Sequence, residues 1–151
     1  MKIFYITAQI PYGRGETFIL DEMLALKEQG VDLLIAPRNP SKGIFHKDGY
    51  ILKENTIWLP LININMFLFF LFYLILEPKF WIIIWEIFRN SRNFKILIKN
   101  LVVLPKSIYL LRLFKCKDIK HIHAHWGSTT ATMAWIVSEL TGIPWSFTLH
   151  R

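Results

Sequence analysis

The fold is decided by residues 1–36, which read MKIFYITAQIPYGRGETFILDEMLALKEQGVDLLIA. Two apolar runs rich in strand-forming residues, Lys2 to Thr7 and Val31 to Ala36, enclose a loop with proline and glycine residues and then a segment whose apolar residues recur at helical spacing. Gly30 follows that segment at the position where glycine commonly ends a helix. Strand, loop, helix and strand form a βαβ unit, and its crossover makes the two strands parallel. We therefore expect an α/β fold, a parallel sheet flanked by helices.

The last part of the chain repeats this pattern. We expect a strand at 120–126, a helix at 130–140 and a strand at 145–149, because alternating and apolar runs are separated by helix-start and helix-end residues. A further short strand is expected at 56–59. With 151 residues, the chain is expected to form a single domain.

The composition narrows the class of protein. Hydrophobic residues make up 53% of the chain, above the ~45–50% typical of soluble domains, which excludes intrinsic disorder. The single cysteine, Cys116, excludes a disulfide-stapled secreted scaffold and favours a reducing compartment. The first residues lack the long apolar run and cleavage site of a signal peptide, so we expect a cytoplasmic protein.

The net charge of +7 is concentrated in one segment. Residues 77–120 hold ten basic and three acidic residues, whereas residues 1–76 and 121–151 are each balanced. The same segment is rich in Trp, Phe, Ile and Leu, and basic residues beside bulky apolar ones suit an anionic membrane surface better than a nucleic acid. We therefore expect membrane contact and no nucleic acid; basic side chains on the solvated face of ordinary helices are the alternative.

Residues 57–117 are expected to form this helical, membrane-associating segment. Residues 57–76 carry no charge and have the length of a transmembrane helix, although the unbroken apolar part is nearer to an interfacial or buried helix. A basic amphipathic helix should follow and end at Pro105. Its expected apolar face is Phe94, Leu97, Ile98, Leu101 and Leu104, and its expected basic face, in contact with the membrane, is Arg92, Lys95 and Lys99.

Two groups of residues could carry chemistry. The loop with Gly13, Gly15 and Glu16 precedes a helix start, where backbone N–H groups can bind a phosphate; a plain turn is the alternative. The second group is three histidines that alternate on one strand, His121, His123 and His125, and could share one face. Same-face positions lie ~7 Å apart, too far for one zinc ion unless the strand bends, so we expect no metal site.

The chain resembles a known family at both ends. The motifs are Glu16-Thr17-Phe18-Ile19 before a helix ending at Gly30, then His121-Ile122-His123-Ala124-His125-Trp126, then Gly142-Ile143-Pro144 and Phe147-Thr148-Leu149-His150. In order and spacing they are similar to the amino-terminal, acceptor-side domain of the GT-B glycosyltransferases of family 4. The resemblance covers about residues 1–36 and 118–151.

The resemblance implies a Rossmann-like domain of an enzyme that transfers a sugar, with retention, from a nucleotide-sugar donor to a lipid-linked or polysaccharide acceptor. It assigns His150 to catalysis and five residues to substrate binding: Gly13, Gly15, Glu16, Thr17 and His125. Arg14 separates two glycines that the family often has adjacent. The family's second, donor-binding domain has no counterpart in residues 1–151, so we expect one incomplete amino-terminal domain that binds no cofactor and is inactive by itself.

The resulting hypothesis is the amino-terminal part of a glycosyltransferase that is cytoplasmic and peripheral on the inner face of the plasma membrane. Its expected partners are a glycan or lipid-linked acceptor, the anionic membrane and a carboxy-terminal donor domain. One alternative is a non-catalytic membrane-associated protein with a span at 57–76, and a second is a histidine metal-binding module.

Overall fold

The computed structural model describes residues 1–13, 18–40, 49–114 and 118–149. The elements in these residues are, in chain order, β1 (Lys2–Thr7), α1 (Phe18–Glu28), β2 (Asp32–Pro37), α2 (Tyr50–Lys53), α3 (Ile64–Leu76), α4 (Lys79–Asn90), α5 (Phe94–Val102), α6 (Leu104–Phe114), β3 (His121–His125), α7 (Thr129–Thr141) and β4 (Trp145–Thr148).

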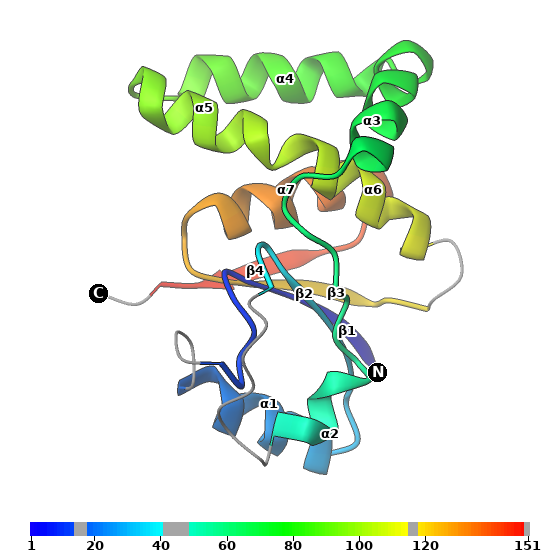
Figure 1. Cartoon of the computed structure of the whole chain (residues 1–151), viewed down its shortest axis with the longest axis vertical. Helices are drawn as coiled ribbons and strands as arrows, with labels where there is room; N and C mark the ends of the chain where they lie inside the picture. The colour runs from blue at the N-terminus through cyan, green and yellow to red at the C-terminus, as the bar shows by residue number, and fades with distance from the viewer. Residues whose placement is uncertain (14–17, 41–48, 115–117, 150–151) are drawn as a thin grey trace.

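The strands form one parallel sheet in the order β2-β1-β3-β4 (Figure 1). β1 pairs with β2 from Lys2 opposite Asp32 onward, and with β3 from Ile3 opposite His121 onward. The prediction of an α/β fold with a Rossmann-like parallel sheet is therefore confirmed, and the four expected principal strands lie within one residue of their predicted ends. The short strand expected at 56–59 is wrong, because Thr56 pairs with Ile35 at a single bridge only.

Helices cover both faces of the sheet (Figure 1). On one face, apolar side chains of β1 and β2 pack with α1, α2 and the loop after β1, in a core that includes Tyr5, Ile10, Tyr12 and Met23. On the other face, alternate side chains of the strands pack against α6 and α7. The strands are apolar toward both layers because parallel sheets are buried on both sides.

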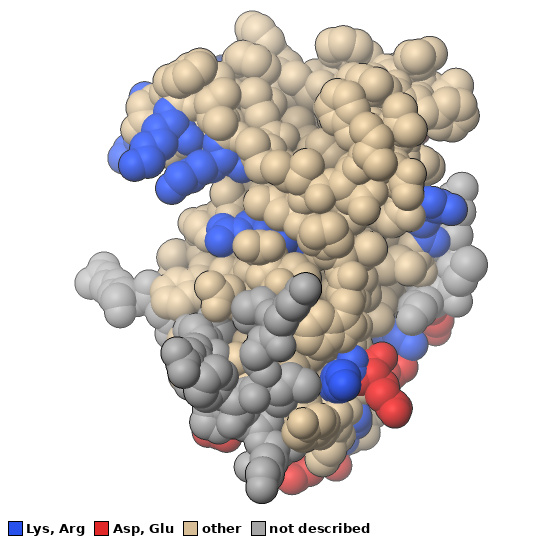
Figure 2. Space-filling model, in the orientation of Figure 1, with Lys and Arg blue, Asp and Glu red and all other residues tan. Residues whose placement is uncertain are grey.

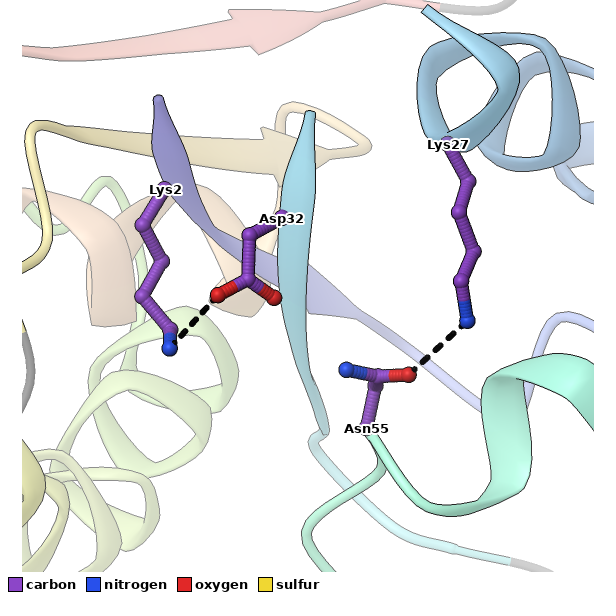
Figure 3. A network of polar contacts seen from close by, with 4 residues as sticks. All are labelled: Lys2, Lys27, Asp32 and Asn55. Atoms are coloured by element: carbon purple, nitrogen blue, oxygen red, sulfur yellow. Dashed lines mark hydrogen bonds and ion pairs between the residues drawn. The ribbon is translucent and has the colours of Figure 1, made fainter. Parts of the chain in front are cut away.

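Polar contacts hold together the end of the sheet at which its strands begin (Figure 3). Lys2 forms an ion pair with Asp32, its pairing partner in β2, at 2.7 Å. Lys27 Nζ, from the end of α1, donates hydrogen bonds to Asn55 Oδ1 at 3.2 Å and to Ile51 O at 2.9 Å. These bonds tie α1 to α2 and to the segment after it.

α3, α4 and α5 form a further helical layer on top of α6 and α7 (Figure 1). Asparagine side chains cap two of these helices: Asn63 accepts a hydrogen bond from Asn65 N and Asn93 accepts one from Ile96 N. Pro105 does not break the basic helix as predicted. The break falls at Val103, and Pro105 lies in the first turn of α6, where a proline loses no helical hydrogen bond.

The residues of the predicted apolar face of the basic helix have different surroundings in the structure. Leu97 and Leu101 pack into the helical layer and Leu104 is buried in α6, but Phe94 is 76% exposed and Ile98 is 42% exposed. The reason is position: α5 lies in the outer layer, with α6 and α7 between it and the sheet, so only one edge of the helix finds a partner.

A large apolar surface results from this arrangement. Of the 23 exposed large hydrophobic residues among those described, 15 lie in α3, α4 and α5; we call these 15 the apolar helix surface. They are Ile64, Phe67, Leu68, Leu71, Phe72, Ile75, Leu76, Trp81, Ile82, Trp85, Phe88, Phe94, Ile96, Ile98 and Val102. Soluble domains rarely expose so many large apolar side chains on three neighbouring helices, so this surface indicates an interaction.

In the described part of the chain, no single helix has both the length and the apolar character needed to cross a membrane. α3 and α4 reach that length and composition together, but the chain bends by 108° between them. The expected interfacial or buried helix inside 57–76 is α3, and residues 57–63 precede it outside any helix.

Candidate functional site

The strand order places a candidate site at the carboxyl ends of β1 and β3. The chain passes from β1 outward to β2 and then returns across β1 to β3, so the direction of winding reverses between β1 and β3. Open parallel sheets bind ligands in the crevice outside the carboxyl ends of their strands at such a switch point. The carboxyl ends also face the same side as the turn between α4 and α5 (Figure 1).

Two of the predicted substrate-binding residues lie at this edge. His125 ends β3 and is 1% exposed; its ring lies 5.4 Å from the ring of Phe18, the first residue of α1. Gly13 lies in the loop after β1, where its N–H donates to Ile10 O at 3.1 Å. The start of the first helix and the end of the third strand are therefore adjacent. Gly15, Glu16, Thr17 and His150 lie outside the described residues.

Gly13 has a packing reason to be glycine. A Cβ atom there would lie 2.8 Å from Ile10 Cγ1 and 3.2 Å from Ile10 O, and the residue is buried. The tight turn by itself favours glycine here, and the close approach of a ligand that the sequence suggested stays a prediction.

The backbone immediately after His125 is strained. Trp126 has a φ of +79°, a value that bulky L-residues rarely adopt and that costs of the order of 1–3 kcal/mol. Neighbouring bonds hold the conformation: Trp126 N donates to Thr148 O, and the buried Thr130 Oγ1 donates to both His125 O and Trp126 O. Strain of this kind concentrates at functional sites, and here it turns the chain sharply into α7.

A basic pocket of about 360 Å³ opens beside this turn. Its polar residues are Arg38 and Asn39, which follow β2, Lys99 of α5, and Ser128 and Thr129 at the start of α7. Its apolar wall comes from Leu61 and from Ile98, Val102 and Val103. Arg38 Nη1 donates to Thr129 Oγ1 at 2.7 Å, and this bond joins the segment after β2 to the start of α7.

A buried lysine lies behind this pocket. Lys106 of α6 is fully buried, and its Nζ donates to Pro37 O at 2.6 Å, Arg38 O at 2.9 Å and Leu59 O at 2.6 Å. Burial, and secondarily the charge of Arg38, lower the pKa of Lys106 to about 7. One of the ten basic groups of 77–120 is therefore internal, contrary to the expectation that this segment places its charge on the surface.

A second pocket, of about 330 Å³, shares Ser128 with the basic pocket. We call it the tryptophan pocket: Trp135 and Trp145 line it together with Glu86, Asn90 and Asn100. The Asn90 amide donates to Glu86 Oε2 at 2.8 Å, and Asn100 Oδ1 accepts from Thr132 Oγ1 at 3.0 Å. Aromatic faces beside amide and carboxylate groups suit a neutral polyhydroxylated ring.

The three alternating histidines share one face, as predicted, but only two of them meet at a common partner. His121 Nε2 and His123 Nδ1 each lie 2.8 Å from Ser146 Oγ on β4, whereas His125 contacts Phe18. Burial is the main cause of a lowered pKa of His123. Among the described residues, no group of three or more His, Cys, Asp or Glu side chains could hold a metal ion.

The predicted basic residues lie beside the apolar helix surface. Arg92 is in the turn between α4 and α5, and Lys95 and Lys99 are one helical turn apart on α5; all three are exposed. Figure 2 shows Lys and Arg side chains at this end of the helical layer, while the Asp and Glu side chains visible from this side lie in the lower half of the view, away from the helical layer.

Sequence reasoning missed Arg38, Lys106 and Trp126. Arg38 contacts Thr129 across 91 positions of sequence, which only the topology reveals. The burial of Lys106 could have been inferred from its neighbours. Val103 and Leu110 lie at helical spacing on either side of it, both are apolar and buried, and they place the lysine on an inward face of the helix.

Comparison with known proteins shows the fold alone. No family model and no curated protein matches the chain. Among solved structures, the C-terminal domain of a hydrogenase from Pyrococcus furiosus is similar, with 14% sequence identity over 97% of this chain and 90% of that chain and a TM-score of 0.55. This likeness supports the Rossmann-like α/β architecture; it lends no support to the resemblance to glycosyltransferases.

Proposed function

We propose that this chain is the acceptor-side domain of a glycosyltransferase that works at an anionic membrane surface. The donor would be a nucleotide-sugar bound with a second domain, and the acceptor a lipid-linked or polysaccharide precursor. The proposal combines the resemblance at both ends of the chain with the apolar helix surface beside the carboxyl edge of the sheet, and this surface is the observation that carries it.

The apolar helix surface has the chemistry of a membrane-interface contact. Trp81, Trp85 and Phe88 recur along the exposed side of α4, and tryptophan is enriched where a protein meets the headgroup layer. Lys95 and Lys99 form a basic stripe next to exposed Phe94 and Ile98 on α5. Apolar side chains that insert and cations that meet anionic headgroups are the two components of peripheral membrane binding.

The tryptophan pocket supports the acceptor part of the proposal. It opens between α4, α5 and the start of α7, next to the carboxyl end of β3. Its tryptophan faces can cover the apolar side of a sugar ring, while Glu86, Asn90 and Asn100 offer hydrogen-bonding groups for hydroxyls. The pocket therefore extends from Gly127 and Ser128, just after β3, to Trp145 at the start of β4.

Sugar transfer tests the enzymatic part of the proposal. The product of the complete reading frame that contains this chain is incubated with radiolabelled nucleotide-sugars and a membrane lipid extract. We expect label to enter the lipid or polysaccharide fraction, and His150→Ala to abolish it while the circular dichroism spectrum is unchanged. His121→Ala is the matched control, because His121 lies at the amino end of β3, and this variant should retain transfer. Absence of transfer from every donor, or full activity of His150→Ala, would contradict the proposal.

A non-catalytic membrane-associated protein is the second candidate, because membrane binding alone, without any enzymatic activity, would account for the apolar helix surface. This candidate gains support if the chain sediments with vesicles of phosphatidylcholine and phosphatidylglycerol and the complete gene product transfers no sugar. Release by high salt or carbonate indicates surface binding, and release by detergent only indicates insertion.

A further inference from the structure

We propose that the basic pocket binds a phosphate group carried on an apolar chain, the headgroup of an anionic lipid. This inference goes beyond the proposed function, because it concerns binding at a pocket that neither Gly13 nor His125, the two predicted site residues that the structure describes, lines. It stands whether or not the protein transfers a sugar.

The charges around the pocket are unbalanced. Arg38 and Lys99 line it, and the buried Lys106 lies behind Arg38. The pocket has no acidic residue among those described, and none of these three cations forms an ion pair with a described residue; Arg38 and Lys106 bond only to neutral oxygens there. Arg38 and Lys99 are therefore two positive charges without a described carboxylate partner, and a bound dianion would balance them.

The donors present suit phosphate. A guanidinium offers a planar fork for two phosphate oxygens, and Arg38 uses one of its nitrogens for Thr129. α7, a 13-residue helix, begins at Thr129, and its Ser128 N-cap makes no side-chain cap hydrogen bond. First-turn N–H groups and the Ser128 hydroxyl therefore add to the two cations, and the helix dipole favours the same charge.

The apolar wall suggests that the phosphate belongs to an amphiphile. Ile98 and Val102 line the pocket and are also members of the apolar helix surface, at 42% and 37% exposure. An acyl chain attached to a bound phosphate could leave along these two side chains onto α5 without crossing water. A free phosphate ion would gain nothing from this wall.

Calorimetric titration tests the site with two probes, sodium phosphate and the water-soluble lipid dihexanoyl phosphatidate, in a buffer without phosphate. We expect the lipid to bind at least about tenfold more tightly than the free ion, because it adds apolar contact. Equal affinity would support a phosphate site but overturn its assignment to a lipid. Absence of heat with both probes would overturn the whole inference.

Lys99→Gln and Lys95→Gln form a matched pair of variants. Both residues are exposed lysines on α5, one turn apart, and Lys99 lines the pocket whereas Lys95 does not. Lys99→Gln should weaken phosphatidate binding about tenfold, the size of one charge-assisted hydrogen bond, and Lys95→Gln should leave it unchanged. Equal losses in the two variants would indicate diffuse surface charge and contradict a defined site. Arg38→Gln should weaken binding at least as much, with folding checked by the urea midpoint.

Discussion

The buried Lys106 makes the stability of the protein depend on pH in a defined direction. The pKa of this ammonium is about 7 in the folded protein, and its ordinary value in the unfolded chain is 10.5. Between these values the unfolded chain binds the proton more tightly than the folded protein does. Raising the pH from about 7 toward 10 therefore increases the free energy of unfolding, because the folded state no longer has to desolvate a charge.

The magnitude follows from the width of this interval. From about pH 7.5 to about pH 9.5 nearly one full proton separates the two states, which corresponds to about 1.3 kcal/mol per pH unit, or roughly 2.5 kcal/mol in all. Lys106→Met keeps the length and apolar stem of the side chain but cannot titrate. The wild-type protein should therefore gain roughly 2.5 kcal/mol over this range relative to Lys106→Met, while other titrating groups cancel in the comparison.

Urea unfolding followed by tryptophan fluorescence at several pH values measures this difference. Lys95→Met is the matched control, since the lysine is exposed on α5, and it should keep the wild-type pH slope. Parallel pH profiles for the wild type and Lys106→Met would refute the reasoning, because they would mean that the ammonium is as well solvated by its three carbonyl partners as by water.

Three further perturbations test other features. Thr130→Val removes a buried hydroxyl that donates to His125 O and Trp126 O, so the urea midpoint should report a loss of about 1–3 kcal/mol. Gly142 ends α7 with a φ of +72°, and Gly142→Ala should cost about 1 kcal/mol in the same assay; an unchanged midpoint would show that the turn relaxes. Trp85 is 64% exposed, so Trp85→Glu should fold normally but no longer co-sediment with vesicles. Ile83 is buried, so Ile83→Glu should unfold the protein.

The sequence predicts the sheet well because its strands are buried on both faces. The run from Lys2 to Thr7 reads as a strand from composition alone, and the structure places β1 there. Gly30 and Gly142, both at positive φ, follow the ends of α1 and α7 and could be recognised as helix ends. Local physics determines these features, so no knowledge of the rest of the fold is needed.

The helical layer is predicted less well, because its apolar residues exceed what the fold can bury. Periodicity placed Phe94, Leu97 and Ile98 on one apolar side of a helix, and the structure exposes Phe94 and Ile98 while Leu97 packs into the layer. Lys106, which charge alone assigned to the surface, is buried. Both outcomes arise because periodicity and charge identify a face without saying what covers it. The site follows the same rule: His125 at a strand end was predictable, but the bond between Arg38 and Thr129 depends on the order of the strands.

The membrane and phosphate proposals constrain one another through α5. This helix contributes Phe94 and Ile98 to the apolar helix surface, and Lys99 with Ile98 and Val102 to the basic pocket. A helix with its side chains is only ~10 Å across, so a bilayer in contact with the outer side of α5 lies within reach of a lipid headgroup bound on its inner side. The crevice outside the carboxyl ends of β1 and β3 lies on the sheet side of α5, and a water-soluble ligand would enter there. A lipid and a soluble molecule would thus approach the same edge from two directions, and charge reversal at Arg92 and Lys95 should weaken attachment to anionic vesicles without lowering the affinity for soluble phosphatidate. A loss of both together would show that membrane contact and phosphate binding are one diffuse electrostatic effect.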